Sequence, residues 1–342
     1  MKLRRVLAAA LLLAGCGEED PATLIADFED QSLVVECRAL ATDNPIFASI
    51  TNVRAASDST VFVVDGVGRQ VAILDAEARV LLRLELPESG PGSVARLFDA
   101  TVSGDSLIVI ADGGRNRLLG LAPTGAELWS TQLDFPLQSV DFAGDRLLVS
   151  AVGMDHRIPG LVHELRGTRL VPLGIPFIPH ADALARMFVN SASLVGRPDG
   201  AAVVAHEMIW PRAWLVPARG DPLPVDVPVP AAVAEQIGHV PTMPMHEDDA
   251  AQLLTPVIGM TIEPNSGDIF YVTRAAPKEE HGSQKAIIRA DERFAYIASV
   301  RLPLNAVKLV YLSAYPDSLI VSDYDLNWYR CPVPPRNRDA GS

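Results

Sequence analysis

The chain has 342 residues, of which 49% are hydrophobic, 21% charged and 6% aromatic. This balance is typical of a soluble globular protein and argues against a disordered or membrane-spanning chain. Lys and Arg total 29 against 42 Asp and Glu, which gives a formal net charge of −13. An anionic surface repels phosphate backbones, so the composition predicts no nucleic-acid partner.

The first 15 residues are organised like an export signal. Lys2, Arg4 and Arg5 precede a nine-residue apolar run at residues 6–14. A helix needs about 20 apolar residues to span a bilayer, so this run is too short to be a membrane anchor. The sequence Leu-Ala-Gly-Cys that ends at Cys16 resembles the lipobox of bacterial lipoproteins. An alternative is a buried N-terminal helix that ends at the Gly-Cys pair.

The lipobox resemblance implies cleavage after residue 15 and a lipid on Cys16, with residues 16–22 as a tether. Cleavage would remove three positive charges and leave a net charge of −16. Gly17, where an inner-membrane lipoprotein would have Asp, implies delivery to the outer membrane, facing the periplasm. The protein is therefore predicted to be exported and held at a membrane by its lipid.

The two remaining cysteines, Cys37 and Cys331, lie near opposite ends of the exported chain. An exported protein is in a compartment that permits disulfides, and a bridge between these cysteines would join the two ends of the domain. The alternative is a pair of buried, unpaired thiols.

A pattern of an acidic turn residue followed by a short apolar run recurs six times, with steps of 47, 40, 54, 69 and 49 residues. Further short apolar runs flank each occurrence, which gives three to four strands per unit joined by Gly and Asp turns. Patterns of long helices are missing. These features predict an all-β fold, a β-propeller of six blades. The runs begin at Asp58, Asp105, Asp145, Asp199, Asp268 and Asp317.

In the first two units the main strand ends in Asp65 or Asp112, and the next strand begins six residues later after a glycine-containing turn. We expect the Asp carboxylate to accept backbone N–H groups of the hairpin and Gly to supply a positive φ. With these residues the chain resembles NHL-type six-bladed propellers, in particular six-bladed β-propeller lipoproteins of bacteria. The resemblance is good over residues 58–133, fair over 134–175 and 306–334, and weak between these ranges.

The resemblance implies a single propeller over residues 23–334 and a disordered tail over 335–342. It also implies that the strand-like residues 32–40 complete the last blade, beside a final strand near residues 328–331. Cys37 and Cys331 would then lie on neighbouring strands, where a disulfide would lock the ring of blades.

The long steps of 54 and 69 residues predict short helical insertions. One is a helix at residues 181–188, and the other is a helical segment at about residues 230–255. Its first helix has Pro230 at the start and Gly238 just beyond the end. This segment either caps the ring and narrows the central channel or packs on the outside.

Residues with recognisable chemistry are sparse. His-Glu pairs begin at His163, His206 and His246, but none has the second histidine of a zinc helix. The acidic residues after His246 are interpreted as a helix start, and His206 as a hydrogen-bonded core histidine. The sequence has no nucleophile elbow and no phosphate-binding loop. No catalytic residue, metal site or cofactor is predicted.

In a propeller the chain enters each blade beside the central channel, so the segments before the first strands surround the mouth of the channel. Polar side chains there are candidate ligand contacts, because propeller ligands commonly bind at this mouth. These residues are Arg96, Gln138, His180, Asp182, Asn305 and Lys308.

The favoured function is a non-catalytic binding or scaffold protein of the cell envelope. It would be a monomer whose partner is an envelope protein, a peptide or a glycan. An alternative is a metal-dependent hydrolase or lyase similar to six-bladed lactonases and NHL-type enzymes, with calcium in the channel. Glu263 and Asn265 are the nearest ligand pair for that metal, although the following Ser-Gly indicates a hairpin turn. A third hypothesis is a sensor or transport accessory that binds a small ligand under the inserted segment.

Overall fold

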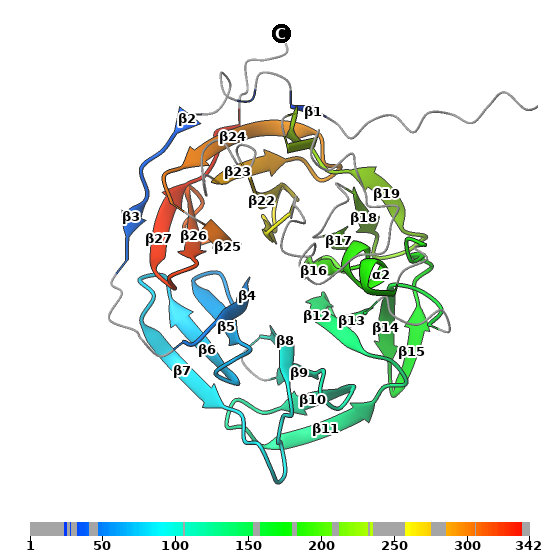
Figure 1. Cartoon of the computed structure of the whole chain (residues 1–342). Coiled ribbons are helices and arrows are strands. Elements are labelled where there is room, and N and C mark those ends of the chain that lie inside the picture. The colour runs from blue at the N-terminus through cyan, green and yellow to red at the C-terminus, as the bar shows by residue number, and fades with distance from the viewer. Residues whose placement is uncertain are drawn as a thin grey trace, which may run out of the picture.

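The computed structural model describes residues 24–25, 28, 33–40, 47–104, 107–152, 158–179, 183–206, 212–231, 233–234, 257–274, 285–304 and 306–336. Six small sheets are arranged around a common axis as the blades of a β-propeller (Figure 1). The predicted all-β, six-bladed fold is therefore confirmed. The leader at residues 1–15, the tether at 16–22, most of the 230–255 insertion and residues 337–342 lie outside the described residues.

Each blade starts with an inner strand at the channel and continues outward to the rim. We number the blades in chain order. Blade 1 contains β4 (Ile50–Ala55), β5 (Thr60–Asp65), β6 (Gln70–Asp75) and β7 (Val80–Glu85). Blade 2 contains β8 (Leu97–Ser103), β9 (Leu107–Asp112), β10 (Arg117–Leu121) and β11 (Glu127–Gln132). Blade 3 contains β12 (Leu137–Ala143), β13 (Arg146–Ala151), β14 (Val162–Arg166) and β15 (Arg169–Pro172).

The remaining blades follow the same plan, and the last is completed from the N-terminus. Blade 4 contains β16 (Ala192–Gly196), β17 (Ala202–His206), β18 (Arg212–Val216) and β19 (Leu223–Asp226). Blade 5 contains β21 (Gly259–Ile262), β22 (Ile269–Arg274), β23 (Lys285–Ala290) and β24 (Tyr296–Leu302). Blade 6 contains β25 (Ala306–Tyr311), β26 (Ser318–Asp323), β27 (Trp328–Pro332) and β3 (Arg38–Ala39). The mouth of the channel is the end where the inner strands begin, and its floor is the end where they finish.

The burial of each strand follows from its place in the blade. Second strands such as β9 are apolar at nearly every position, because neighbouring blades cover both of their faces. The outer strand β7 alternates between half-buried and exposed residues, because only one of its faces meets another blade. The core therefore lies between blades, as where Phe62 and Val64 of blade 1 pack with Leu97 and Ile108 of blade 2.

The N-terminal residues run along the rim as a strap (Figure 1). β1 (Leu24–Ile25) pairs in parallel with β20 (Val229–Pro230), and β2 (Leu33–Val34) pairs in parallel with β24 of blade 5. Only β3 joins blade 6, where it pairs antiparallel with β27. The prediction that residues 32–40 form one strand of the last blade is thus half right. An extended segment on a curved rim passes from the edge of one blade to the edge of the next.

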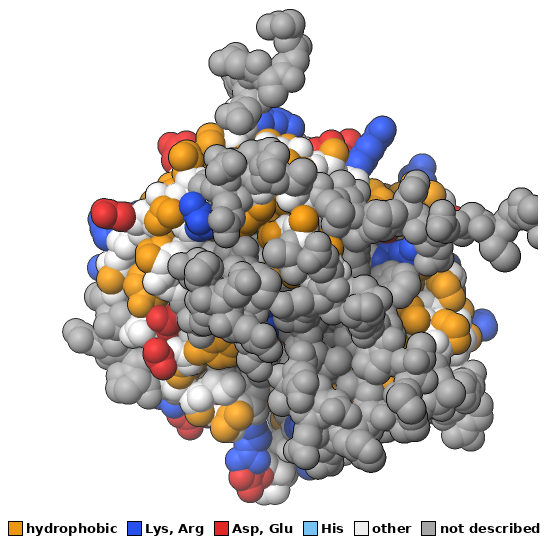
Figure 2. All heavy atoms as spheres, turned by 45° about the horizontal axis from the view of Figure 1, so that its top comes forward, with side chains coloured by type: hydrophobic (Ala, Val, Ile, Leu, Met, Phe, Trp, Pro, Cys, Tyr) orange, Lys and Arg blue, Asp and Glu red, His pale blue; other side chains and the backbone are white. Residues whose placement is uncertain are grey.

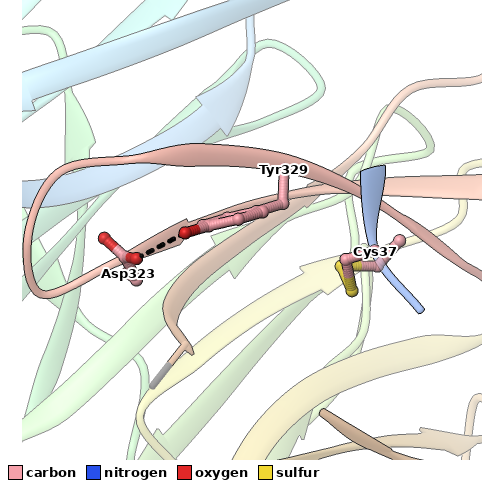
Figure 3. Close-up of a disulfide and its surroundings, with 4 residues drawn as sticks. Cys37, Asp323 and Tyr329 are labelled. Atoms are coloured by element: carbon pink, nitrogen blue, oxygen red, sulfur yellow. Dashed lines mark hydrogen bonds between the residues drawn. A yellow bond between two sulfur atoms is a disulfide. The ribbon is translucent and has the colours of Figure 1, made fainter. Parts of the chain in front are cut away.

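Cys37 and Cys331 form a disulfide between the strap and β27, with their Cα atoms 4.4 Å apart (Figure 3). Cys331 is fully buried among apolar residues between blades 5 and 6. The predicted pairing is confirmed, and the alternative of two unpaired thiols is wrong. The disulfide fixes the strap to the last blade where the ring closes.

The predicted bond from a hairpin N–H to the Asp carboxylate is confirmed for Asp65, whereas the backbone N–H groups bound by Asp112 belong to the segment before its blade. Asp65 accepts the backbone N–H of Ala48, Ser49 and Gly68 at 2.7–3.0 Å. Asp112 binds the segment that enters blade 2 in the same way. In the last blade, Asp323 accepts a hydrogen bond from the Tyr329 hydroxyl at 3.0 Å (Figure 3).

The expected role of glycine in these hairpins is wrong. The residues with positive φ are Arg69 and Asn116, both at 49°, rather than the glycines before them. Gly68 is required for space instead, because a Cβ there would lie 2.3 Å from the carboxylate of Asp65. Glycine thus lets the carboxylate reach the backbone N–H of the turn.

The helix predicted at residues 181–188 is observed as α2 (Ala183–Val189), immediately before blade 4. Within the residues that the structure describes, no helix is long and apolar enough to cross a membrane. Whether the 230–255 insertion covers the channel stays a prediction, because most of it is outside those residues.

Candidate functional site

The mouth of the channel is shaped by a repeated irregularity. In blades 1, 2, 3 and 6 the register shifts at the second residue of the inner strand. In blade 3 this residue is Gln138, one of the predicted ligand contacts. Its amide nitrogen donates to the Ser191 hydroxyl at 2.6 Å, and its amide oxygen accepts the N–H of Ala192 at 3.4 Å. Gln138 therefore connects blade 3 to the start of blade 4.

Of the other predicted contacts, the structure describes Arg96 and Lys308. Arg96 is exposed before β8, with its guanidinium 4.7 Å from the centre of the Phe98 ring. Lys308 is half-buried in β25. His180, Asp182 and Asn305 lie outside the described residues. Because Arg96 and Gln138 make separate local contacts, a shared ligand site at the mouth stays a prediction.

The sequence interpretation missed a ring of polar residues inside the channel. Asn52, Asp99 and Ser139 are the third residues of their inner strands, and Lys308 has the same position in β25. The fifth residues of the first three inner strands are also polar, namely Arg54, Thr101 and Asp141. Charged residues inside otherwise apolar strands were the available signal.

Arg54 makes most of the contacts among these polar residues. Its guanidinium donates two hydrogen bonds to the two carboxylate oxygens of Asp99, at 2.8 and 2.7 Å. It also donates to the backbone carbonyls of Ala100 and Val140, at 2.7 and 2.9 Å. Asp99 further accepts the Ser139 hydroxyl at 2.6 Å and the amide of Asn52 at 3.1 Å. One buried arginine thus joins the inner strands of blades 1, 2 and 3.

Asp141 extends the network to blade 4. It accepts the Thr101 hydroxyl at 2.6 Å and the backbone N–H of Gly196 at 2.9 Å, and it lies 3.3 Å from Nε of Arg54. Burial raises the pKa of Asp141, and the attraction of Arg54 does not fully offset it. Burial also opposes ionisation of Asp99, but Arg54 and the hydrogen bonds hold its pKa below the usual value. Asp99 is therefore the firmly ionised partner of Arg54.

A cavity of about 240 Å³ lies at the floor of the channel, and residues of all six blades line it. We call it the floor recess. The buried network forms part of its wall through Arg54, Thr101 and Asp141, and Phe142 and Met260 contribute apolar surface. The sequence interpretation placed ligand contacts at the opposite end of the channel. The recess is a second candidate binding site.

Glu263 and Asn265, the pair considered as ligands of a channel metal, are not part of the network around Arg54. Glu263 belongs to the β21–β22 hairpin, where it accepts the Ser266 hydroxyl at 2.7 Å and lies 3.5 Å from Arg289. Among the described residues, no group of three His, Cys, Asp or Glu side chains is arranged to hold a metal ion. The interpretation of this segment as a hairpin turn is supported.

Charged side chains are distributed around the rim on the face drawn in Figure 2, where acidic, basic and apolar groups alternate among the described residues.

A second cavity, of about 650 Å³, lies between blades 2 and 3, and His163 is part of its wall. His163 is 1% exposed and packs on Phe135, with 4.7 Å between the ring centres. Neither ring nitrogen has a hydrogen-bond partner within the described part of the chain. His206 is equally buried, but its Nδ1 pairs with the Val189 carbonyl at 3.0 Å, so its prediction as a core histidine is confirmed.

Replacing His163 with phenylalanine is expected to make the fold less sensitive to acid. Burial lowers the pKa of His163 to about 4, so between pH 6.5 and 4 the unfolded chain binds the proton more readily than the folded one. The stability is therefore intact above pH 6.5 and is lost as the pH falls, by up to about 3 kcal/mol for one such histidine. Urea unfolding at pH 7.5 and 4.5 measures this difference.

The matched variant is His206→Phe, because burial also lowers the pKa of His206 to about 4. It should gain the same acid tolerance but lose about 1 kcal/mol at pH 7.5, since the Val189 carbonyl loses its donor. An H163F protein that loses as much stability on acidification as the unmodified chain would contradict the interpretation.

The sequence matches no protein-family model, and no curated protein is significantly similar to it. Several solved structures are similar in fold. A member of the DUF4221 family from Bacteroides vulgatus has a TM-score of 0.58 at 10% identity, covering 88% of this chain and 97% of that one. A protein of Bacteroides fragilis described as exported has a TM-score of 0.56 at 10% identity, covering 84% and 83%. A streptogramin B lyase has a TM-score of 0.50 at 13% identity, covering 87% and 96%. At these identities the similarities establish the β-propeller fold and nothing about function.

Proposed function

We propose that the protein is an exported, lipid-anchored β-propeller of the bacterial cell envelope, which binds a partner and catalyses no reaction. The supporting observation is that the buried charged side chains of the channel are bonded to one another. Arg54, Asp99 and Asp141 are buried and bonded to one another, so these groups stabilise the ring and are not poised to react. The floor recess beside them offers hydrogen-bonding and apolar groups on rigid strands, which suits binding.

Two features support export and anchoring. The Cys37–Cys331 disulfide supports export, because stable disulfides are typical of oxidising compartments outside the cytoplasm. The residues before the strap carry the lipobox-like sequence that ends at Cys16. We place the protein at the outer membrane, facing the periplasm, as an NHL-type propeller that acts as a monomer. Its partner is an envelope protein, a peptide or a glycan, and it needs no cofactor.

Labelling tests the anchor. The full chain, produced in a Gram-negative host with an alkyne-tagged fatty acid, is expected to incorporate the label and to fractionate with membranes. The Cys16→Ser variant should incorporate none. Equal labelling of both proteins, or none of either, would refute lipidation at Cys16 without affecting the proposal of binding.

Photo-crosslinking and elemental analysis test the binding role. A photoreactive residue at Phe142, in the floor recess, is expected to give one discrete adduct in the native envelope, whereas the same residue at the exposed Leu128 of blade 2 should give none. The purified chain should contain no stoichiometric metal. Stoichiometric calcium whose removal abolishes a hydrolase or lyase activity would replace this proposal with the enzymatic alternative.

A further inference from the structure

Two positive side chains of blade 5 have no partner of opposite charge among the residues that the structure describes. Arg274 ends β22 and Lys285 begins β23, and the two residues are directly paired in the sheet. Lys285 is 3% exposed and has no hydrogen bond or ion pair within the described chain. The buried Nε of Arg274 also has no hydrogen-bond partner. This pair lies at the mouth, because β21 runs from mouth to floor and β22 returns.

Such a pair is unfavourable without a counter-ion. Like charges directly opposite on adjacent strands repel each other, and burial of most of the Lys285 side chain reduces the hydration of its ammonium. Elsewhere blade 5 follows the usual rule: Arg289, four residues beyond Lys285, is paired with Asp268 and Glu263. Burial and the nearby Arg274 lower the pKa of Lys285 to about 8. At neutral pH, therefore, most Lys285 side chains are still protonated.

Arg301 of the same blade is a useful comparison with this pair. Arg301 in β24 also has a buried Nε without a partner. It is opposite Ala286, one register position from Lys285, so strand alternation places it on the other face of the sheet. Arg301 therefore serves as a control and not as part of the site.

We propose that Arg274 and Lys285 bind a small oxyanion, a carboxylate or phosphate group, at the mouth of blade 5. The planar guanidinium of Arg274 matches two oxygens of such a group, and the Lys285 ammonium supplies a further charged donor. A bound anion offsets the repulsion between the two cations and supplies the hydrogen-bond acceptors that their donors lack. The site depends neither on lipidation nor on the floor recess, and it gives the mouth a preference for an acidic group on a ligand.

The composition of the chain permits a direct test. The sequence contains four lysines, at positions 2, 278, 285 and 308. The full chain, labelled with ¹³Cε-lysine and purified in non-ionic detergent, is titrated with inorganic phosphate and separately with acetate at constant ionic strength. We expect a saturable shift of the Lys285 signal, assigned by its loss in Lys285→Met. Arg274→Gln should weaken the binding about tenfold, and Arg301→Gln should leave it unchanged.

The two titrations distinguish a phosphate from a carboxylate as the preferred group. A shift that does not saturate, or that Lys308 shares equally, would be general screening and would overturn the proposal. So would equal binding by R274Q and the unmodified chain. The segment between β22 and β23 contains Glu279 and Glu280, outside the described residues. If the response is seen only in the Glu279→Gln/Glu280→Gln variant, the chain supplies its own counter-ion and the proposal is wrong.

Discussion

Replacing Arg54 with methionine is expected to lower the free energy of unfolding by about 3 to 5 kcal/mol at pH 7. Methionine fills a similar volume but leaves Asp99 and Asp141 buried without a positive partner, at 2% and 7% exposure. It also removes the hydrogen bonds that join blade 1 to the carbonyls of Ala100 and Val140. Without Arg54, the pKa values of both carboxyls rise above those of the unfolded chain. The loss should therefore be smaller at pH 5, and urea unfolding at both pH values measures it.

Arg79→Met is the matched control, since Arg79 is exposed and its ion pair with Asp75 is at the surface. That variant should lose less than about 1 kcal/mol. The triple variant Arg54→Met/Asp99→Asn/Asp141→Asn should recover part of the lost stability, because no buried charge remains unpaired. If R54M is as stable as R79M, the channel network does not hold the blades together.

Loss of the Cys37–Cys331 disulfide is expected to cost about 2 to 5 kcal/mol. The bridge spans 294 residues, so it restrains almost the whole unfolded chain. The strand pairing that holds the strap to blade 6 is short, since β3 and β27 join only Ala39 to Tyr329 and Arg38 to Arg330. Denaturant unfolding with and without a reductant measures the loss, and hydrogen exchange should show β3 and β27 opening first.

The Cys37→Ala/Cys331→Ala variant should match the reduced protein and should not respond to reductant. Cys16→Ser should respond to reductant as the unmodified chain does. A protein whose stability is the same in its reduced and oxidised forms would show that the strand pairing alone closes the ring.

Features carried by local patterns could be predicted from the sequence. Each Asp-led apolar run became part of a blade, because the turn chemistry and the burial of a second strand both depend on neighbouring residues. Asp65 binds an N–H of its hairpin as expected, whereas Asp112 binds the N–H groups of the segment before its blade. The positive φ at Arg69 was not foreseen, because the turn selects a conformation and glycine is only one residue able to adopt it.

The channel network was beyond prediction for a different reason. Arg54 and Asp99 are 45 residues apart, and they meet because the inner strands of adjacent blades carry the same register shift. A one-residue change in either strand would turn these side chains away from each other. The split of residues 32–40 between two blades is likewise set by the curvature of the rim and not by their own pattern.

The sequence by itself determined the short strands and the number of blades, because both follow from short-range periodicity, and it left open whether Cys37 and Cys331 are paired. Only the tertiary structure decided which polar groups meet. It buried Arg54 between two carboxylates and set Arg274 beside Lys285. Among the described residues, it also left the ring nitrogens of His163 without a hydrogen-bond partner. The free energy of a buried charge depends on its neighbours in space, and in a ring of blades those neighbours come from distant parts of the chain.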